Sequence, residues 1–149
     1  KAVELGAISV VPFESERCIK RPAPDKAAKL CERLGRIARE AAKQCGRSRL
    51  PEVGSFISLS EMVSRLGSFD LALFCYENED GTTLKSVLEQ STGVKSIAVI
   101  VGSEGGFSPA EAERIKAAGG ISVGLGPRIL RCETAPDYAL AAISYHYEL

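Results

Sequence analysis

Blocks of apolar residues separated by polar segments run along the chain, and their periods predict a series of strands and helices. Nearly continuous apolar runs at 71–76 and 96–101 predict strands that are covered on both faces. Shorter β-branched runs at 8–12, which stops at a proline, and at 121–125 predict two further strands. The residues at 13–24 are mostly polar and predict a long loop.

Apolar residues spaced three and four apart from Asp25 to Cys45 predict an amphipathic helix that ends at Gly46. The run Ser108-Pro109-Ala110-Glu111 predicts a helix start, because it places a serine at the cap, a proline at the first position and a glutamate that completes a capping box. Further helices are expected at 59–66, 84–90 and 134–147.

This alternation of strands and helices favours an α/β domain with a mostly parallel sheet. The 149 residues fit one such domain, 1–149. No apolar run approaches the roughly 20 residues that a membrane helix needs, so we expect a soluble protein with no membrane partner.

The cysteines and the histidine bear on metal binding and compartment. The five cysteines are widely spaced, no Cys-x-x-Cys pair is present, and the one histidine is His146, which argues against a metal site. Unpaired cysteines are typical of a reducing compartment. We therefore expect a cytoplasmic protein. An organelle such as a plastid or mitochondrion stays open, because the N-terminal segment is expected to be missing.

The zero net charge hides an asymmetry between two parts of the chain. Residues 1–50 carry 12 lysines and arginines against 6 acidic residues, a net of +6, whereas residues 51–149 carry 7 against 13, a net of −6. Much of the positive charge lies on the helix predicted from Asp25, at Lys26, Lys29, Arg33, Arg36, Arg39 and Lys43. Such a face suits a polyanion such as nucleic acid, although solvent-exposed helices are commonly charged as well.

Two glycine-rich loops carry the candidate chemistry: Gly-Ser-Glu-Gly-Gly-Phe-Ser at 102–108 and Gly-Leu-Gly-Pro-Arg-Ile-Leu-Arg at 124–131. Both accompany predicted strands, and ligands of open α/β sheets bind beyond the carboxyl ends of strands. Neither loop has the Walker A or the Gly-x-Gly-x-x-Gly pattern, which disfavours ATP and NAD. Their glycines would let the backbone approach a flat heterocycle, with Leu125, Ile129 and Leu130 as the apolar walls of an adenine slot.

These loops, with the residues that follow them, resemble those of a known family. The segment 102–108 together with Leu-Gly-Pro-Arg-Ile-Leu-Arg-Cys-Glu-Thr-Ala at 125–135 is similar to the RsmE family of ribosomal RNA methyltransferases, in the SPOUT superfamily. Matches at 4–6, 15–17 and 40–47 extend the resemblance over nearly the whole chain. The chain departs from the family at Ser103, where proline is usual, and at Cys132, where threonine is usual.

The resemblance implies a homodimer that uses S-adenosyl-L-methionine to methylate N3 of a uridine in small-subunit (16S) ribosomal RNA. It implies a SPOUT-type fold, a mostly parallel sheet flanked by helices, whose C-terminal segment threads a deep trefoil knot. It also implies a preceding PUA-like β-barrel that binds RNA. Because the chain starts at Lys1 within what reads as the end of a helix, we expect that barrel to be missing from this fragment.

The resemblance also implies which residues form the cofactor pocket. These are Leu73, Phe74, Gly102, Leu125, Gly126, Ile129, Leu130 and Arg131. At Cys132 a thiol stands where the family has a hydroxyl, so a strong hydroxyl hydrogen bond is not expected there.

The chemistry of the reaction suggests the catalytic residues. Uridine N3 carries a proton, so the enzyme must help to remove it or stabilise the resulting anion. We expect Arg17 and Arg131 to stabilise negative charge on the uracil carbonyls, and Glu104 or Glu133 to accept the proton. Two structural alternatives stay open: Arg131 could cap loop carbonyls, and Glu104 could bind the amides of its glycine turn.

The expected RNA contacts are Arg17, Glu40, Gln44, Arg47 and Arg49. The spacings of four and three between Glu40, Gln44 and Arg47 place them on one helix face, where they could meet RNA or the dimer partner. Two other functions remain open on sequence grounds. One is an RNA-binding module of this fold that has lost the chemistry, and the other is a SPOUT methyltransferase that acts on transfer RNA.

Overall fold

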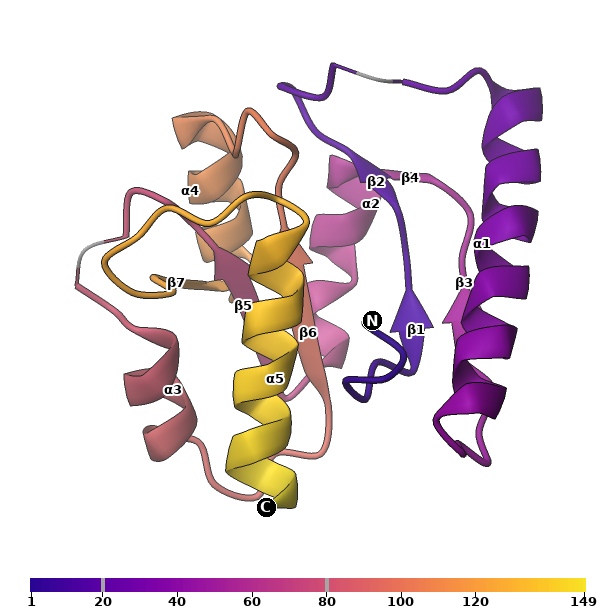
Figure 1. Ribbon diagram of the computed structural model, residues 1–149. Coiled ribbons are helices and arrows are strands. Elements are labelled where there is room, and N and C mark those ends of the chain that lie inside the picture. The colour runs from indigo at the N-terminus through magenta and orange to yellow at the C-terminus, as the bar shows by residue number, and fades with distance from the viewer. Residues whose placement is uncertain (20, 80) are drawn as a thin grey trace.

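The chain folds into parallel strands flanked by helices (Figure 1). The computed structural model describes residues 1–19, 21–79 and 81–149, and no helix in these segments could cross a membrane. The strands are β1 (Ser9–Val10), β2 (Phe13–Glu14), β3 (Glu52–Val53), β4 (Ile57–Ser58), β5 (Leu71–Cys75), β6 (Ile97–Val101) and β7 (Ile121–Val123). The helices are α1 (Pro24–Gln44), α2 (Leu59–Ser64), the 3₁₀ turn η1 (Leu66–Ser68), α3 (Leu84–Gln90), α4 (Pro109–Ala117) and α5 (Thr134–Glu148).

Strand β5 occupies the middle of a three-stranded parallel sheet, between β6 and β7. Leu73 of β5 is in register with Val99 of β6 and with Ile121 of β7. Two further parallel pairs, β1 with β3 and β2 with β4, continue the arrangement toward α1 (Figure 1). The predicted α/β class with parallel strands is therefore confirmed.

Side chains of β5 alternate between two hydrophobic cores, as the two-residue period of a strand requires. Leu71 and Leu73 pack with α3 and α5 residues in one core. Ala72 and Phe74 pack in the other core, which α2 and α4 complete. Both faces of the strand are thus buried, which explains its continuous apolar run.

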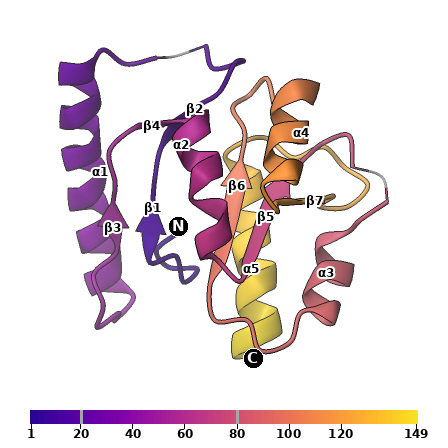
Figure 2. The ribbon, with the colours of Figure 1, turned by 180° about the vertical axis from the view of Figure 1, so that it is seen from behind.

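The helices divide between the two faces of the sheet. Figure 1 shows α5 in front of β5 and β6, and the view from behind in Figure 2 shows α2 and α4 on the opposite face. Helix α1 lies at the edge of the molecule, next to β3. Only Ala38 and Ala42 of α1 are buried, whereas Ile37 remains 54% exposed, so its predicted apolar face is only partly covered.

Three of the strands differ from the sequence-based prediction. Strand β2 lies within the segment predicted as a loop, and β3 and β4 were not predicted at all. Each contains two residues, too few to show a period, and each is held by a partner distant in sequence, such as Phe13 opposite Ile57. The Phe13 ring also stacks on Phe107 at a centroid distance of 6.2 Å, so tertiary packing stabilises this strand.

Gly120 provides a test of the packing between α4 and β7. A Cβ atom at this position would stand 2.5 Å from Cγ2 of the fully buried Ile115 and 2.9 Å from the Ile115 carbonyl oxygen. We expect Gly120→Ala to lower the free energy of unfolding by about 1–3 kcal/mol, because backbone and core must shift to relieve the overlap. Urea unfolding followed by circular dichroism measures the change.

Gly67→Ala is the matched control, since a Cβ at Gly67 would meet no atom within 4 Å and its backbone is not left-handed. It should change the free energy of unfolding by less than about 0.5 kcal/mol. Equal losses in the two variants would contradict the packing argument.

Candidate functional site

The carboxyl ends of β5, β6 and β7 meet at one edge of the sheet and border a cavity of about 960 Å³. Its walls come from three segments that are far apart in sequence: the end of β5, the loop after β6 and the loop after β7. The lining residues are Cys75, Tyr76, Glu77, Glu79, Val101, Gly102, Ser103, Glu104, Gly105, Gly106, Val123, Gly124, Leu125, Gly126, Pro127, Arg128, Ile129, Leu130, Arg131, Cys132, Glu133 and Ala135. Both predicted glycine-rich loops therefore contribute to one cavity.

The loop after β6 is held firmly at its far end. Phe107 is 1% exposed and packs edge-on against Phe74 at 6.0 Å. Ser108 then caps α4 in the predicted capping box, in which its hydroxyl accepts from the Glu111 amide while the Glu111 carboxylate accepts from the Ser108 amide. This anchoring fixes the glycines of the loop relative to the sheet.

The loop after β7 is tied to the segment that precedes α3. The Gly124 amide donates to the Thr82 carbonyl at 2.8 Å, and the Leu84 amide donates to the Gly124 carbonyl at 3.1 Å. Gly126 follows with a φ of +114°, a backbone conformation that favours glycine. Glycine is required here because residues with a side chain rarely adopt this φ.

Carboxylates outnumber arginines around the cavity, with Glu77, Glu79, Glu104 and Glu133 against Arg128 and Arg131. The Glu77 carboxylate lies where a side chain at Gly106 would be, so that glycine makes room for it. The Ser122 hydroxyl donates a hydrogen bond to the Glu79 carboxylate. This hydrogen bond is the main reason that the pKa of Glu79 lies below its ordinary value. The cavity is thus suited to a ligand with positive charge.

The second loop ends in a cluster formed by Arg131, Cys132 and Glu133. The Cys132 thiol donates to Glu133 at 3.3 Å, and burial is the main cause that raises its pKa. The pKa of Glu133 is lowered by hydrogen bonds from the backbone amide of Glu133 and from the Cys132 thiol. Arg131 stands 4.0 Å from Glu133 and is 86% exposed, so this ion pair is loose and leaves the guanidinium accessible to a ligand.

Six of the eight predicted cofactor residues line the cavity: Gly102, Leu125, Gly126, Ile129, Leu130 and Arg131. Leu73 and Phe74 do not, because they are 1% and 0% exposed inside the two cores. The structure places the cavity wall further along the same segment, at Cys75, Tyr76 and Glu77. Ile129 borders the cavity but is 86% exposed, so Leu125 and Leu130 are the better covered apolar walls.

The predicted catalytic residues come together around the first loop and the end of the second. Glu104 and Glu133 both line the cavity. Arg17, which is distant in sequence, donates from its guanidinium to the Gly105 carbonyl at 3.0 Å. The side chain of Arg17 thus lies beside the cavity-lining loop, although Arg17 itself does not line the cavity.

The predicted RNA contacts other than Arg17 lie apart from the cavity, on α1 and just beyond it. Glu40 pairs with Lys43 at 2.8 Å, which is the main cause that lowers the pKa of the Glu40 carboxyl. The Arg47 guanidinium donates to the carbonyls of Val3 and Ala7, at 2.8 and 2.6 Å, and so holds the N-terminal turn. Gln44 is the last residue of α1, so Arg47 lies beyond the helix and the expectation that Glu40, Gln44 and Arg47 share one helix face is wrong. Arg49 is exposed. Their contact with RNA stays a prediction.

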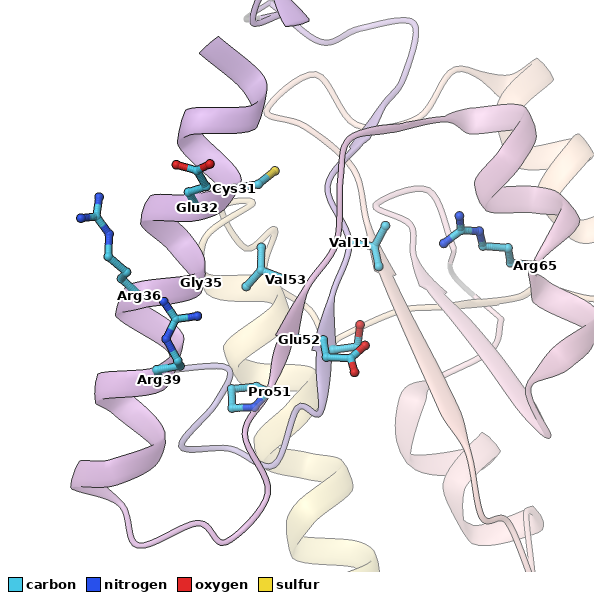
Figure 3. Close-up of a pocket in the computed structure, with 12 residues that line it drawn as sticks. Val11, Cys31, Glu32, Gly35, Arg36, Arg39, Pro51, Glu52, Val53 and Arg65 are labelled. Atoms are coloured by element: carbon cyan, nitrogen blue, oxygen red, sulfur yellow. The ribbon is translucent and has the colours of Figure 1, made fainter. Parts of the chain in front are cut away.

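A second hollow, of about 800 Å³, lies beside α1 over strands β1 and β3 (Figure 3). Figure 3 shows Arg36 and Arg39 on α1 and Arg65 across the strands from them. Arg65 pairs with Glu61. Neither Arg36 nor Arg39 forms an ion pair within the part of the chain that the structure describes, so both can bind an external anion.

Sequence reasoning did not identify the contribution of the end of β5 and the turn after it, namely Cys75, Tyr76, Glu77 and Glu79. The signal was available, because a buried parallel strand next to two others must bring its carboxyl end to the same edge. In the described parts of the chain, no group of three or more histidine, cysteine, aspartate or glutamate side chains is placed to hold a metal ion.

The chain is similar in sequence to known RNA methyltransferases. A family model described as an RNA methyltransferase domain matches residues 1–144. Ribosomal RNA small subunit methyltransferase E of Bacillus subtilis is 39% identical over 153 residues, which covers 100% of this chain and 60% of that protein. The protein of the same name from Synechocystis is 37% identical over 142 residues, which covers 95% of this chain and 46% of that protein.

A solved structure shares the fold. The crystal structure of a ribosomal RNA small subunit methyltransferase E from Neisseria gonorrhoeae bound to S-adenosyl methionine matches with a TM-score of 0.83 and 35% identity. The match covers 97% of this chain and 57% of that chain. This chain therefore spans between about half and three fifths of the length of these relatives.

Cysteine reactivity tests the environment at the end of β5. Burial raises the pKa of Cys75 to about 12, so almost no reactive thiolate is present at neutral pH. We expect iodoacetamide at pH 7.5 to modify the exposed Cys45 and to leave Cys75 unmodified, as measured by peptide mass spectrometry. Raising the pH to 9 should not change this result, because pH 9 is still far below that pKa.

The same reagent in denaturant is the control, and both cysteines should then react at similar rates. If Cys75 of the folded chain reacted as fast as Cys45, the environment described for this side of the cavity would be wrong.

Proposed function

The chain belongs to the RNA methyltransferase domain family that includes the ribosomal RNA small subunit methyltransferases E, and we propose that it transfers a methyl group from S-adenosyl-L-methionine to small-subunit ribosomal RNA. The observation that carries this proposal is the single cavity in which both motif loops meet at the carboxyl edge of the sheet. We propose N3 of a uridine as the methylated atom.

The cavity fits the cofactor in size and in chemistry. A volume of about 960 Å³ lies in the range of small-molecule sites. Leu125 and Leu130 supply apolar walls for an adenine ring, and the loop that begins at Gly102 borders the same space. The surrounding carboxylates suit the positive charge of the cofactor, which when bound supplies an electrophilic methyl group on sulfur.

The residues around the cavity suggest how the chain would treat the uracil ring. Each well-placed donor near a developing anion contributes roughly 3 kcal/mol to catalysis, and the accessible guanidinium of Arg131 is placed to act so. Arg17, held beside the first loop, is the second such donor. Glu133 has a lowered pKa and is therefore a weak proton acceptor. We therefore propose that stabilisation of the uracil anion by the two arginines contributes more to catalysis than proton acceptance by Glu133. Glu104 is the other candidate proton acceptor.

The RNA substrate would contact α1 through phosphates. Lys26, Lys29, Arg33, Arg36, Arg39 and Lys43 recur at spacings of three and four and form a basic stripe along this helix. In the described chain only Lys43 of this stripe pairs with a carboxylate. Arg36 and Arg39 of this stripe also border the adjacent hollow, whose lining includes Glu32 and Glu52 as well (Figure 3). We include Arg17, Glu40, Gln44, Arg47 and Arg49 among the proposed RNA contacts.

We also propose the knot and the homodimer that the family resemblance implies. The start of the second loop is hydrogen-bonded through Gly124 to Thr82 and Leu84, in the segment that leads from β5 into α3, and this contact supports a threaded C-terminal segment. Exposed tyrosines on α5, Tyr138 at 48% and Tyr145 at 74%, support a contact with a second copy, because aromatic side chains are enriched at protein interfaces.

Binding and transfer assays test the function. Calorimetry with S-adenosylhomocysteine should show binding, and unmethylated small ribosomal subunits should gain 3-methyluridine, detected by mass spectrometry of nucleosides. Leu130→Ala should weaken cofactor binding about tenfold, because it removes an apolar wall.

Leu50→Ala is the control, since Leu50 is exposed and outside the cavity, and it should bind the ligand like the wild type. Absence of binding at millimolar ligand would refute the cofactor assignment and leave an RNA-binding module as the alternative. Methylation of transfer RNA in place of ribosomal RNA would favour a SPOUT methyltransferase that acts on transfer RNA.

Salt dependence tests the basic stripe. The triple variant Lys29→Gln, Arg33→Gln and Arg36→Gln removes three cations and should weaken binding to ribosomal RNA. It should also lower the slope of log affinity against log salt by about 2–3, because each neutralised phosphate contributes roughly 0.7–0.9. Filter binding at several salt concentrations gives both quantities.

The matched control changes the same charge elsewhere, with Lys85→Gln, Lys95→Gln and Lys116→Gln. It should leave the slope near that of the wild type. A similar fall in both triple variants would show that total charge, and not the stripe, governs RNA binding.

A further inference from the structure

Residues 15–18 form a short segment that is docked on the loop after β6, although nearly ninety positions separate the two in sequence. The Glu16 amide donates to the buried Glu111 carboxylate at 2.7 Å. The Arg17 guanidinium donates to the Gly105 carbonyl at 3.0 Å. A Cβ at Gly105 would stand 2.9 Å from the Arg17 Cβ, so the two backbones are in close contact.

Ser103 joins this segment to the cavity. Ser103 lines the cavity, and its hydroxyl donates to the Arg17 carbonyl at 3.2 Å. Its own carbonyl accepts from the Gly106 amide at 2.9 Å, which closes the glycine turn. The backbone of Arg17 is therefore held by Ser103 while its side chain is directed by Gly105, two residues further along the same loop.

We propose that Ser103 is a positioning residue for Arg17: its hydroxyl holds the Arg17 backbone against the cavity-lining loop and thereby places the guanidinium for the uracil ring. This inference rests on the proposed function, in which Arg17 acts on the substrate. Two contacts at different points of Arg17 restrict both its backbone and its side chain. Without them, an exposed arginine would sample many conformations. Such preorganisation increases the rate because less reorganisation is left for the transition state.

The expected effect follows from the strength of one such contact. A neutral hydrogen bond contributes modestly, so Ser103→Ala should lower kcat about 2- to 10-fold. The Kd for S-adenosylhomocysteine should not change, since the hydroxyl donates to Arg17 and the substitution keeps the backbone and Cβ of this position. Ser103→Thr, which keeps a hydroxyl, should recover most of the activity.

A double-mutant cycle separates positioning from a general structural role. If Ser103 acts through the guanidinium, Ser103→Ala should lower kcat in the wild-type background and have no further effect in the Arg17→Ala background. Ser64→Ala is the matched control, because the Ser64 hydroxyl also donates to an exposed backbone carbonyl, that of Glu61, and should leave kcat unchanged. All variants are assayed as the full chain with unmethylated small ribosomal subunits.

Hydrogen exchange provides a readout that needs no catalysis. Ser103→Ala should speed amide exchange in the peptide that contains residues 15–18, while exchange in α3 stays unchanged. Additive losses in the cycle, a weaker Kd for S-adenosylhomocysteine, or unchanged exchange at 15–18 would each overturn the inference. A wild-type chain that binds no cofactor and methylates no RNA would refute the proposed function, and the exchange result would still decide whether Ser103 holds this segment.

Discussion

The parallel pairing of β5 with both β6 and β7 is the constraint on which the rest of the structure depends. Because Leu73 and Phe74 are buried on opposite faces of β5, helices must cover both faces of the sheet. The ends of the strands are then the remaining places where the sheet can meet a ligand. Three parallel strands end at the same edge, so the loops that leave them must share one cavity.

Buried and partly buried hydrogen bonds turn this shared edge into a defined site. Glu111 accepts from the amides of Ser108 and Glu16, so the start of α4 and a distant N-terminal segment are tied to the same carboxylate. The buried carboxylate is thus satisfied by two donors, as burial of a polar group requires. Arg17 is brought beside the glycine loop by this arrangement, which links the proposed cofactor cavity to the proposed RNA substrate.

Charge is separated in space as it is in sequence. The cavity is bordered mainly by carboxylates, which suit a sulfonium cofactor, whereas α1 presents a stripe of cations at the edge of the molecule. A polyanion and a cationic small molecule would therefore approach different parts of the chain. The exposed side chain of Ile37 shows that α1 is not covered by the described chain over much of its apolar face.

The sequence by itself determined the elements with strong local signals: the long amphipathic helix, the capping box at Ser108, the continuous apolar strands β5 and β6, and the two glycine loops. These signals are local because periodicity and capping depend on residues a few positions apart. Only the tertiary structure decided the two-residue strands β2, β3 and β4, whose stability comes from partners distant in sequence. It also decided that Cys75 and Glu77, not Leu73 and Phe74, border the cavity. Which residue of this segment first lies outside the hydrophobic cores depends on where the neighbouring strands end.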